Sequence, residues 1–128
     1  MTWRLTVHSG FAAAHRLVGT GGKCESLHGH NFKVTLEVEG EMLDDQGMII
    51  DFGVLKGALR SVLEDLDHTD LNSRRVFAGG SPSSENIARF IFEKVSGRLP
   101  AAGVSVRSVT VGESETASAT YLPGENGD

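Results

Sequence analysis

A regular alternation of apolar and polar side chains in two segments constrains the fold of this chain more than any other feature. Apolar residues and histidines take the odd positions from 3 to 17, interrupted only by Ser9, and the even positions from 28 to 38. Successive side chains of a β-strand point to opposite faces, so the first segment predicts one or two half-buried strands and the second predicts one. The side chains expected on the buried faces are Trp3, Leu5, Val7, Phe11, Ala13, His15 and Leu17, then His28, His30, Phe32, Val34, Leu36 and Val38.

Helical spacing replaces this alternation in the middle of the chain. Asp51 is a suitable N-cap for a first helix, and Ser83 is a suitable N-cap for a second, which Gly97 should end. The apolar positions with helical spacing are Phe52, Leu55, Leu59, Val62, Leu63 and Leu66 in the first helix, and Ile87, Phe90, Ile91 and Val95 in the second. Two helices are therefore expected between the strands.

The region from 103 to 122 predicts two more strands around a turn near residues 113–116. Val104 and Val106 are even, whereas Val109 and Val111 are odd, and this change of parity indicates a β-bulge between them. The expected order β-β-α-α-β-β is typical of an α+β fold, in which helices cover one face of an antiparallel sheet.

Length and charge limit the classes of function. A chain of 128 residues fits one domain, expected here over residues 1–122, with residues 123–128 as a frayed tail. The net charge is −5 and no basic stripe is present, so a nucleic-acid partner is not expected. The single cysteine, the lack of a long apolar run and the unremarkable N-terminus favour a cytoplasmic protein without a membrane partner.

Three histidines are expected to converge. His15 ends the buried face of the first strand, and His28 and His30 begin that of the next, so an antiparallel hairpin would bring the imidazoles together. Three imidazoles with an open fourth position are typical of catalytic Zn²⁺, although iron would also fit. A lone inward histidine is usually a hydrogen-bonded core residue, but three on one face favour a metal. His8 has the opposite parity, and no role is expected for it.

Cys24 precedes this pair of histidines in a polar loop and has three possible roles. As a fourth ligand it would close a structural zinc site. As a free thiol near a cation it would have a lowered pKa and could act as a nucleophile or proton acceptor. A small buried side chain is the third possibility, which the polar, glycine-rich loop disfavours.

Two further groups have both structural and chemical interpretations. His68 follows Asp67 at the end of the first predicted helix, where it could interact with the helix dipole or, oriented by Asp67, exchange a proton with Cys24. Glu113 is two residues after Val111, so the two side chains should share one face of the strand. The Glu113 carboxylate should therefore point from an apolar face, where it needs a partner. That partner could be a cation of the protein or the N–H groups of a ligand.

Six motifs in order resemble the 6-pyruvoyl-tetrahydropterin synthase / 6-carboxy-tetrahydropterin synthase family. They are FAAAHRL, CESLHGHNF, GMIIDFGVLK, LDHTDLN, PSSENIA and VGESETASATY, and together they span about residues 4 to 122. The resemblance implies a tunnelling fold: a four-stranded antiparallel sheet with two helices, assembled as trimers and usually as homohexamers.

The resemblance also implies a zinc-dependent lyase and assigns roles to single residues. It implies that His15, His28 and His30 bind Zn²⁺ and that Cys24, Asp67 and His68 form a proton relay. It also implies that Glu113 anchors the pterin ring, in a role sometimes assigned to the relay as well, and that the active site lies between subunits. The implied reaction converts 7,8-dihydroneopterin triphosphate to 6-carboxy-5,6,7,8-tetrahydropterin, releasing acetaldehyde and triphosphate, for queuosine and other 7-deazapurines.

Two other functions remain open from the sequence. Glu25 follows Cys24, at a position where a related subgroup uses a glutamate to cleave the side chain to 6-hydroxymethyl-dihydropterin for folate synthesis, so Glu25 is also a candidate substrate-contacting residue. The other possibility is a non-catalytic module that zinc stabilises, with Cys24 as a ligand.

Overall fold

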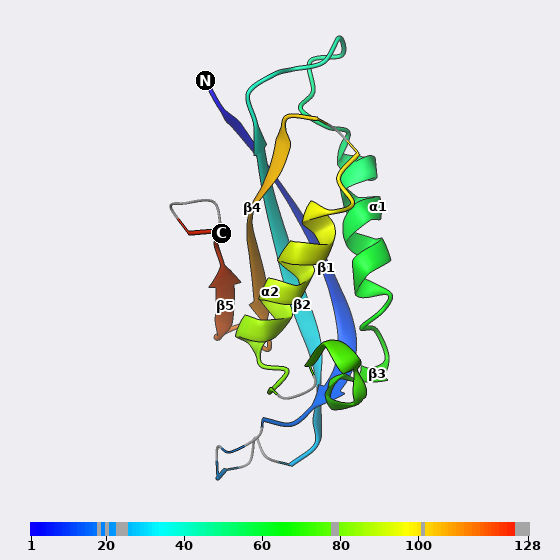
Figure 1. The fold of residues 1–128 in the computed structure, drawn as a ribbon, viewed down its shortest axis with the longest axis vertical. Helices are drawn as coiled ribbons and strands as arrows, with labels where there is room; N and C mark the ends of the chain where they lie inside the picture. The colour runs from blue at the N-terminus through cyan, green and yellow to red at the C-terminus, as the bar shows by residue number, and fades with distance from the viewer. Residues whose placement is uncertain (18, 20, 23–25, 78–79, 101, 125–128) are drawn as a thin grey trace.

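The computed structural model describes residues 1–17, 19, 21–22, 26–77, 80–100 and 102–124. Figure 1 shows a long sheet with two helices on one side. In chain order the elements are β1 (Trp3–His15), β2 (His28–Gly40), α1 (Phe52–Leu63), β3 (Thr69–Asp70), the 3₁₀ helices η2 (Leu71–Ser73) and η3 (Arg75–Phe77), α2 (Ser84–Ser96), β4 (Val104–Gly112) and β5 (Ser118–Tyr121).

Within the described residues, the strands form one mixed sheet in the order β3-β1-β2-β4-β5. β1 and β2 form a long antiparallel hairpin, paired from Trp3↔Gly40 to His15↔His28. The expected four antiparallel strands are present, but the expectation of a purely antiparallel sheet is wrong, because β3 adds a short parallel pairing with β1 at Ala13 and Ala14. Two residues are too few to leave a periodic signal in the sequence.

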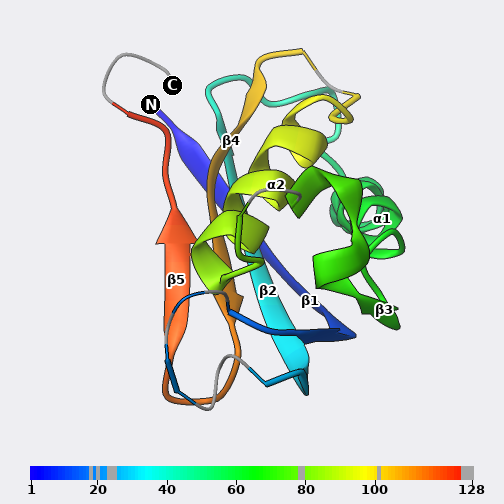
Figure 2. The same ribbon diagram turned by 60° about the horizontal axis from the view of Figure 1, so that its bottom comes forward.

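Both helices pack on the face of the sheet that the alternation predicted to be buried (Figure 2). The predicted caps are confirmed: the Asp51 side chain accepts from the N–H groups of Gly53 and Val54, and the Ser83 side chain accepts from that of Asn86. Phe52 differs from the expectation, because it begins α1 at the surface and remains 53% exposed. No helix in the described part of the chain is long and apolar enough to cross a membrane.

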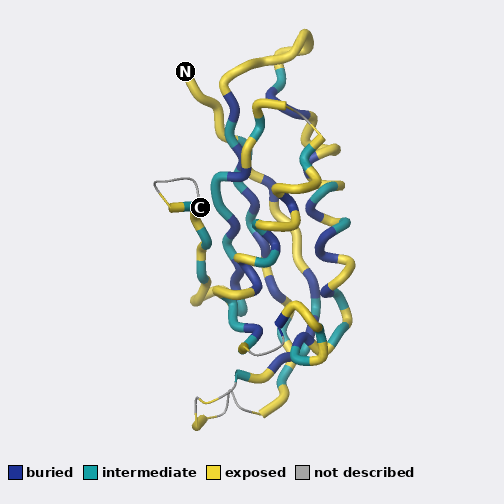
Figure 3. Tube along the Cα trace, in the orientation of Figure 1, coloured by how far each residue is buried: buried dark blue, intermediate teal, exposed yellow. Residues whose placement is uncertain are grey.

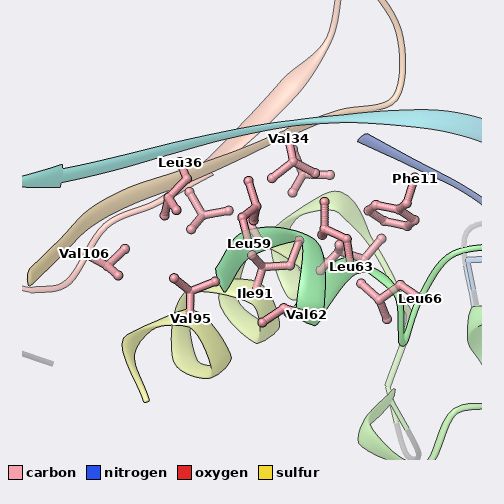
Figure 4. Close-up of a cluster of buried hydrophobic side chains, with 14 of the residues drawn as sticks. Phe11, Val34, Leu36, Leu59, Val62, Leu63, Leu66, Ile91, Val95 and Val106 are labelled. Atoms are coloured by element: carbon pink, nitrogen blue, oxygen red, sulfur yellow. The ribbon is translucent and has the colours of Figure 1, made fainter. Parts of the chain in front are cut away.

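The core lies between the sheet and the two helices. The buried stretches of the chain run along this interface (Figure 3), and Figure 4 shows the side chains of Leu36, Leu59 and Ile91 meeting there. These three are fully buried. Burial of a large aliphatic side chain stabilises a fold by about 1.5–3 kcal/mol, so this layer holds the hairpin against the helices.

The predicted β-bulge is confirmed in β4. Glu37 pairs with Ser108 and the next residue, Val38, pairs with Val106, so Arg107 is the extra residue. Both Val106, before the bulge, and Val109, after it, are therefore buried. The bulge sets which side chains of the following residues face the helices.

Candidate active site

The three predicted imidazoles meet at the end of the β1–β2 hairpin. His15 pairs with His28 across the two strands, and Ala13 pairs with His30, so the three rings share the face that packs against the helices. One ligand nitrogen from each ring lies within 4.8 Å of the others. His15 is fully buried, and the other two are partly buried. The predicted convergence is therefore confirmed, while metal binding remains a prediction.

Backbone carbonyls fix which nitrogen of two rings carries the proton. His15 Nδ1 lies 2.7 Å from the carbonyl oxygen of Pro82, and His28 Nδ1 lies 2.7 Å from that of Ser26. A carbonyl can only accept, so in each ring Nδ1–H donates and Nε2 of the neutral ring keeps its lone pair. Metal-bound histidines are oriented in this way by a bond from their second nitrogen.

The environment of His15 Nε2 fits a bound cation. This atom is buried and has no hydrogen-bond partner among the residues that the structure describes. Leaving a buried polar group unsatisfied costs about 1–3 kcal/mol, a cost that coordination of a metal ion would remove. Burial lowers the pKa of His15, which keeps the ring in the neutral form that a metal requires. The three residues therefore fit a zinc ion.

Glu113 brings a carboxylate to the same place. It follows β4, and its Oε1 lies 3.4 Å from His15 Nε2 while its Oε2 lies 3.8 Å from His30 Nε2. Its side chain is about one-third exposed, so one side of the carboxylate faces solvent. The sequence predicted an inward carboxylate that needs a partner, and the structure places it against the imidazoles of its own chain.

Asp67 and His68 form a pair at the other edge of β1. His68 Nδ1 lies 3.0 Å from Asp67 Oδ2, and the other carboxylate oxygen accepts from the backbone N–H of Ala12 at 2.9 Å. That backbone bond, followed by the contact with His68, lowers the pKa of Asp67. His68 has a left-handed backbone with φ 59°, and its own N–H donates to the Ala12 carbonyl. Its side chain is 82% exposed and so accessible to a ligand.

Among the described residues, no interaction joins the Asp67–His68 pair directly to the three imidazoles. His30 and His68 do line one open cavity of about 520 Å³, together with the small residues Ala12, Ala14 and Gly29. Ala12, Ala14 and Gly29 alternate with the residues of the histidine cluster, so this side of the cavity belongs to the face of the hairpin opposite to the three rings.

Cys24 and Glu25 lie outside the described residues, so their predicted roles have no structural counterpart here. His8 bonds Thr35 on the exposed face of the sheet, away from the site. The Pro82 carbonyl was not predicted, because a backbone group has no signature in the sequence. Asn72, which bonds the backbone of Arg16, was not singled out either, although it ends the motif LDHTDLN.

The fold and the site together define a tunnelling-fold protein with a three-histidine centre and a nearby acid–histidine pair. The family model of 6-pyruvoyl tetrahydropterin synthase matches residues 4–124, and the chain belongs to this family. A solved 6-pyruvoyl tetrahydropterin synthase from Caenorhabditis elegans has the same fold, with a TM-score of 0.86 and 28% identity over 97% of both chains.

Relatives with different names resemble this chain to a similar degree. The 6-carboxy-5,6,7,8-tetrahydropterin synthase of Synechocystis sp. is 39% identical over 94% of this chain and 93% of its own length. The dihydroneopterin monophosphate aldolase of Pyrococcus furiosus is 36% identical over 78% of this chain and 81% of its own length. Identity alone therefore does not separate the two activities.

Proposed function

We propose that this chain converts 7,8-dihydroneopterin triphosphate to 6-carboxy-5,6,7,8-tetrahydropterin, with release of acetaldehyde and triphosphate. The observation that carries the proposal is the three-histidine cluster around the buried His15, in which two rings present an unprotonated Nε2 and a carboxylate lies beside them. The name of the Synechocystis relative supports this reaction over others of the family.

Zn²⁺ is the proposed cofactor, held by His15, His28 and His30. When bound, it would supply a Lewis acid that acidifies the side-chain hydroxyls of the substrate. Glu113 faces the same space, so its carboxylate can accept N–H groups of the pterin ring and orient the ring in two-point contact. The Pro82 and Ser26 carbonyls keep the ligand rings in the required orientation.

Cys24 and His68 are the proposed proton-transfer residues. His68 Nδ1 carries a proton toward the Asp67 carboxylate, which leaves Nε2 of the exposed ring to accept or donate a proton at the substrate. The lowered pKa of Asp67 keeps this carboxylate ionised, so that it can stabilise the imidazolium formed in the exchange.

We further propose that the chain acts as a homohexamer, as two trimers. β3 pairs with β1 only at Ala13 and Ala14, so the outer edge of β1 from Trp3 to Phe11 faces no strand within the described residues. The outer edge of β5 is also open there, and unpaired edges can be covered by another chain. Sedimentation of the purified protein at six times the monomer mass is the expected result.

Product analysis with 7,8-dihydroneopterin triphosphate tests the reaction. The proposal expects 6-carboxy-5,6,7,8-tetrahydropterin and acetaldehyde from the zinc-loaded protein. Cys24→Ala should retain zinc and lose turnover. Loss of zinc together with a weakened fold in that variant would instead identify Cys24 as a ligand and the chain as a zinc-stabilised binding module.

The aldolase reaction is the second candidate, supported by the Pyrococcus relative and by Glu25 after Cys24. Its products would be 6-hydroxymethyl-dihydropterin and a glycolaldehyde-type fragment. Glu25→Gln separates the two candidates, because it should abolish cleavage to the hydroxymethyl product and leave the carboxy product in place.

A further inference from the structure

We propose that Asn72 is a positioning residue, which holds the Asp67–His68 pair in register with the strand that carries His15. The inference rests on the proposed function for its effect on turnover. It is drawn from contacts between two segments that are far apart in sequence, the end of β1 and the loop that follows α1.

Asn72 binds the backbone of the residue directly after His15. The Arg16 N–H donates to Asn72 Oδ1 at 2.8 Å, and Asn72 Nδ2 donates to the Arg16 carbonyl at 3.0 Å. The side-chain amide thus bonds both polar groups of one residue, as a neighbouring strand would. It continues the pairing of the β1 edge beyond the point where β3 ends.

The same segment is attached to β1 at its other end by Asp67 and His68. The Asp67 carboxylate accepts from the Ala12 N–H, and the His68 N–H donates to the Ala12 carbonyl. Thr69 and Asp70 pair with Ala13 and Ala14 in between. Asn72 is therefore one of two side-chain anchors that enclose β3, and the exposed His68 ring stands on the segment between them.

The chemistry of the asparagine side chain explains why this residue type is needed. A carboxamide offers a donor and an acceptor in one plane, whereas carboxylate, hydroxyl and aliphatic side chains of this size lack one or both in that arrangement. His68 has a left-handed backbone, a conformation that is costly for a residue other than glycine and persists only when its surroundings impose it. A second anchor beyond β3 supplies such a constraint.

The test compares Asn72→Leu with Ser73→Ala in the zinc-loaded protein. Leucine has nearly the shape of asparagine and neither hydrogen bond. Ser73 Oγ donates to the Asp70 carbonyl in the same segment and, within the described residues, makes no hydrogen bond to β1, so Ser73→Ala removes a local bond and leaves the anchor intact.

For Asn72→Leu we expect kcat to fall on the order of tenfold, since small misplacements of a catalytic group have large effects. KM and zinc affinity should stay within about twofold of the parent values, because the Pro82 carbonyl orients His15 independently of Asn72. Amide hydrogen exchange at His68 should accelerate by about tenfold, although the substitution touches neither His68 nor Ala12. Ser73→Ala should match the parent protein in all of these.

The inference would be overturned if Asn72→Leu changed neither kcat nor amide exchange at His68. It would also be overturned if Asn72→Leu and Ser73→Ala lowered kcat and accelerated this exchange equally. If Asn72→Leu does not fold, Asn72→Asp replaces it, because aspartate keeps the acceptor for the Arg16 N–H and loses the donor. If the parent protein gives no turnover, the proposed function has failed, and exchange at His68 alone then decides whether Asn72 holds this segment.

Discussion

His15 combines two features that are rarely found together in a core residue. One ring nitrogen has a short hydrogen bond to Pro82, and the other is buried without a hydrogen-bond partner in the described part of the chain. A histidine that served packing alone would be expected to satisfy both nitrogens or to expose one to water. This nitrogen instead points at two other imidazoles and a carboxylate, an arrangement that could hold a cation.

The pKa of His15 predicts how the metal-free protein responds to pH. Burial lowers this pKa from the ordinary value of 6.5, so the folded state prefers the neutral ring. The unfolded state then takes up a proton first, and stability is lost as the pH falls through 6.5 and on through the lowered folded pKa. Urea unfolding in EDTA at several pH values should show this slope. His15→Gln should flatten it, and an equal slope in both proteins would contradict the assignment.

Asp67→Asn tests the acid–histidine pair. The amide oxygen can still accept from the Ala12 N–H, but the charge that faces His68 is lost. Turnover should fall by about 10²-fold, the lower end of what acid–base groups contribute, while zinc content stays at the parent value. Steady-state kinetics and metal analysis check this, and a variant with parent kcat would remove Asp67 from the mechanism.

At the scale of elements, the start of α2 connects helix capping to the three-histidine cluster. Ser83 caps this helix, and the residue before it supplies the carbonyl that orients His15. Ser83→Ala and Asp51→Ala should each cost about 1 kcal/mol, since each removes one helix cap. Only Ser83→Ala should also weaken zinc binding, measured by competition with a chelator. Equal zinc affinity in both variants would show that the turn before α2 does not affect zinc binding by the three histidines.

Some elements were predictable because they carry a repeated signal. Alternation from 3 to 17 and 28 to 38 fixed the buried face and hence the meeting of the histidines, and the parity change after Val106 revealed the bulge. β3 and the Asn72 contact depend on backbone groups that any sequence possesses, so neither has a periodic signal. Phe52 fits the helical spacing but is exposed, so this spacing does not predict burial at the first residue of a helix.

At the scale of the whole molecule, zinc should act as a stabilising ligand. Any ion that binds only the folded state adds to its free energy of unfolding, by about 2.7 kcal/mol when free zinc is 100 times Kd. Thermal unfolding with and without zinc should show this gain. His30→Ala should lose most of it while keeping the fold, because His30 is only partly buried. A parent protein insensitive to zinc would contradict the proposed cofactor.

Arg107 lets two valines of β4 that are three residues apart share one face of the sheet. Val106 and Val109 are three residues apart and both buried, so loss of Arg107 would bring them to the two-residue spacing of a regular strand and leave Val109 and Glu113 on their present side. The effect of a deletion here would therefore depend on the number of residues lost: loss of Arg107 alone removes the bulge and keeps the facing, whereas loss of Arg107 and Ser108 would turn the following side chains over and send the Glu113 carboxylate to the side away from the imidazoles. The facing of Glu113 is thus under a stricter constraint than the length of this strand.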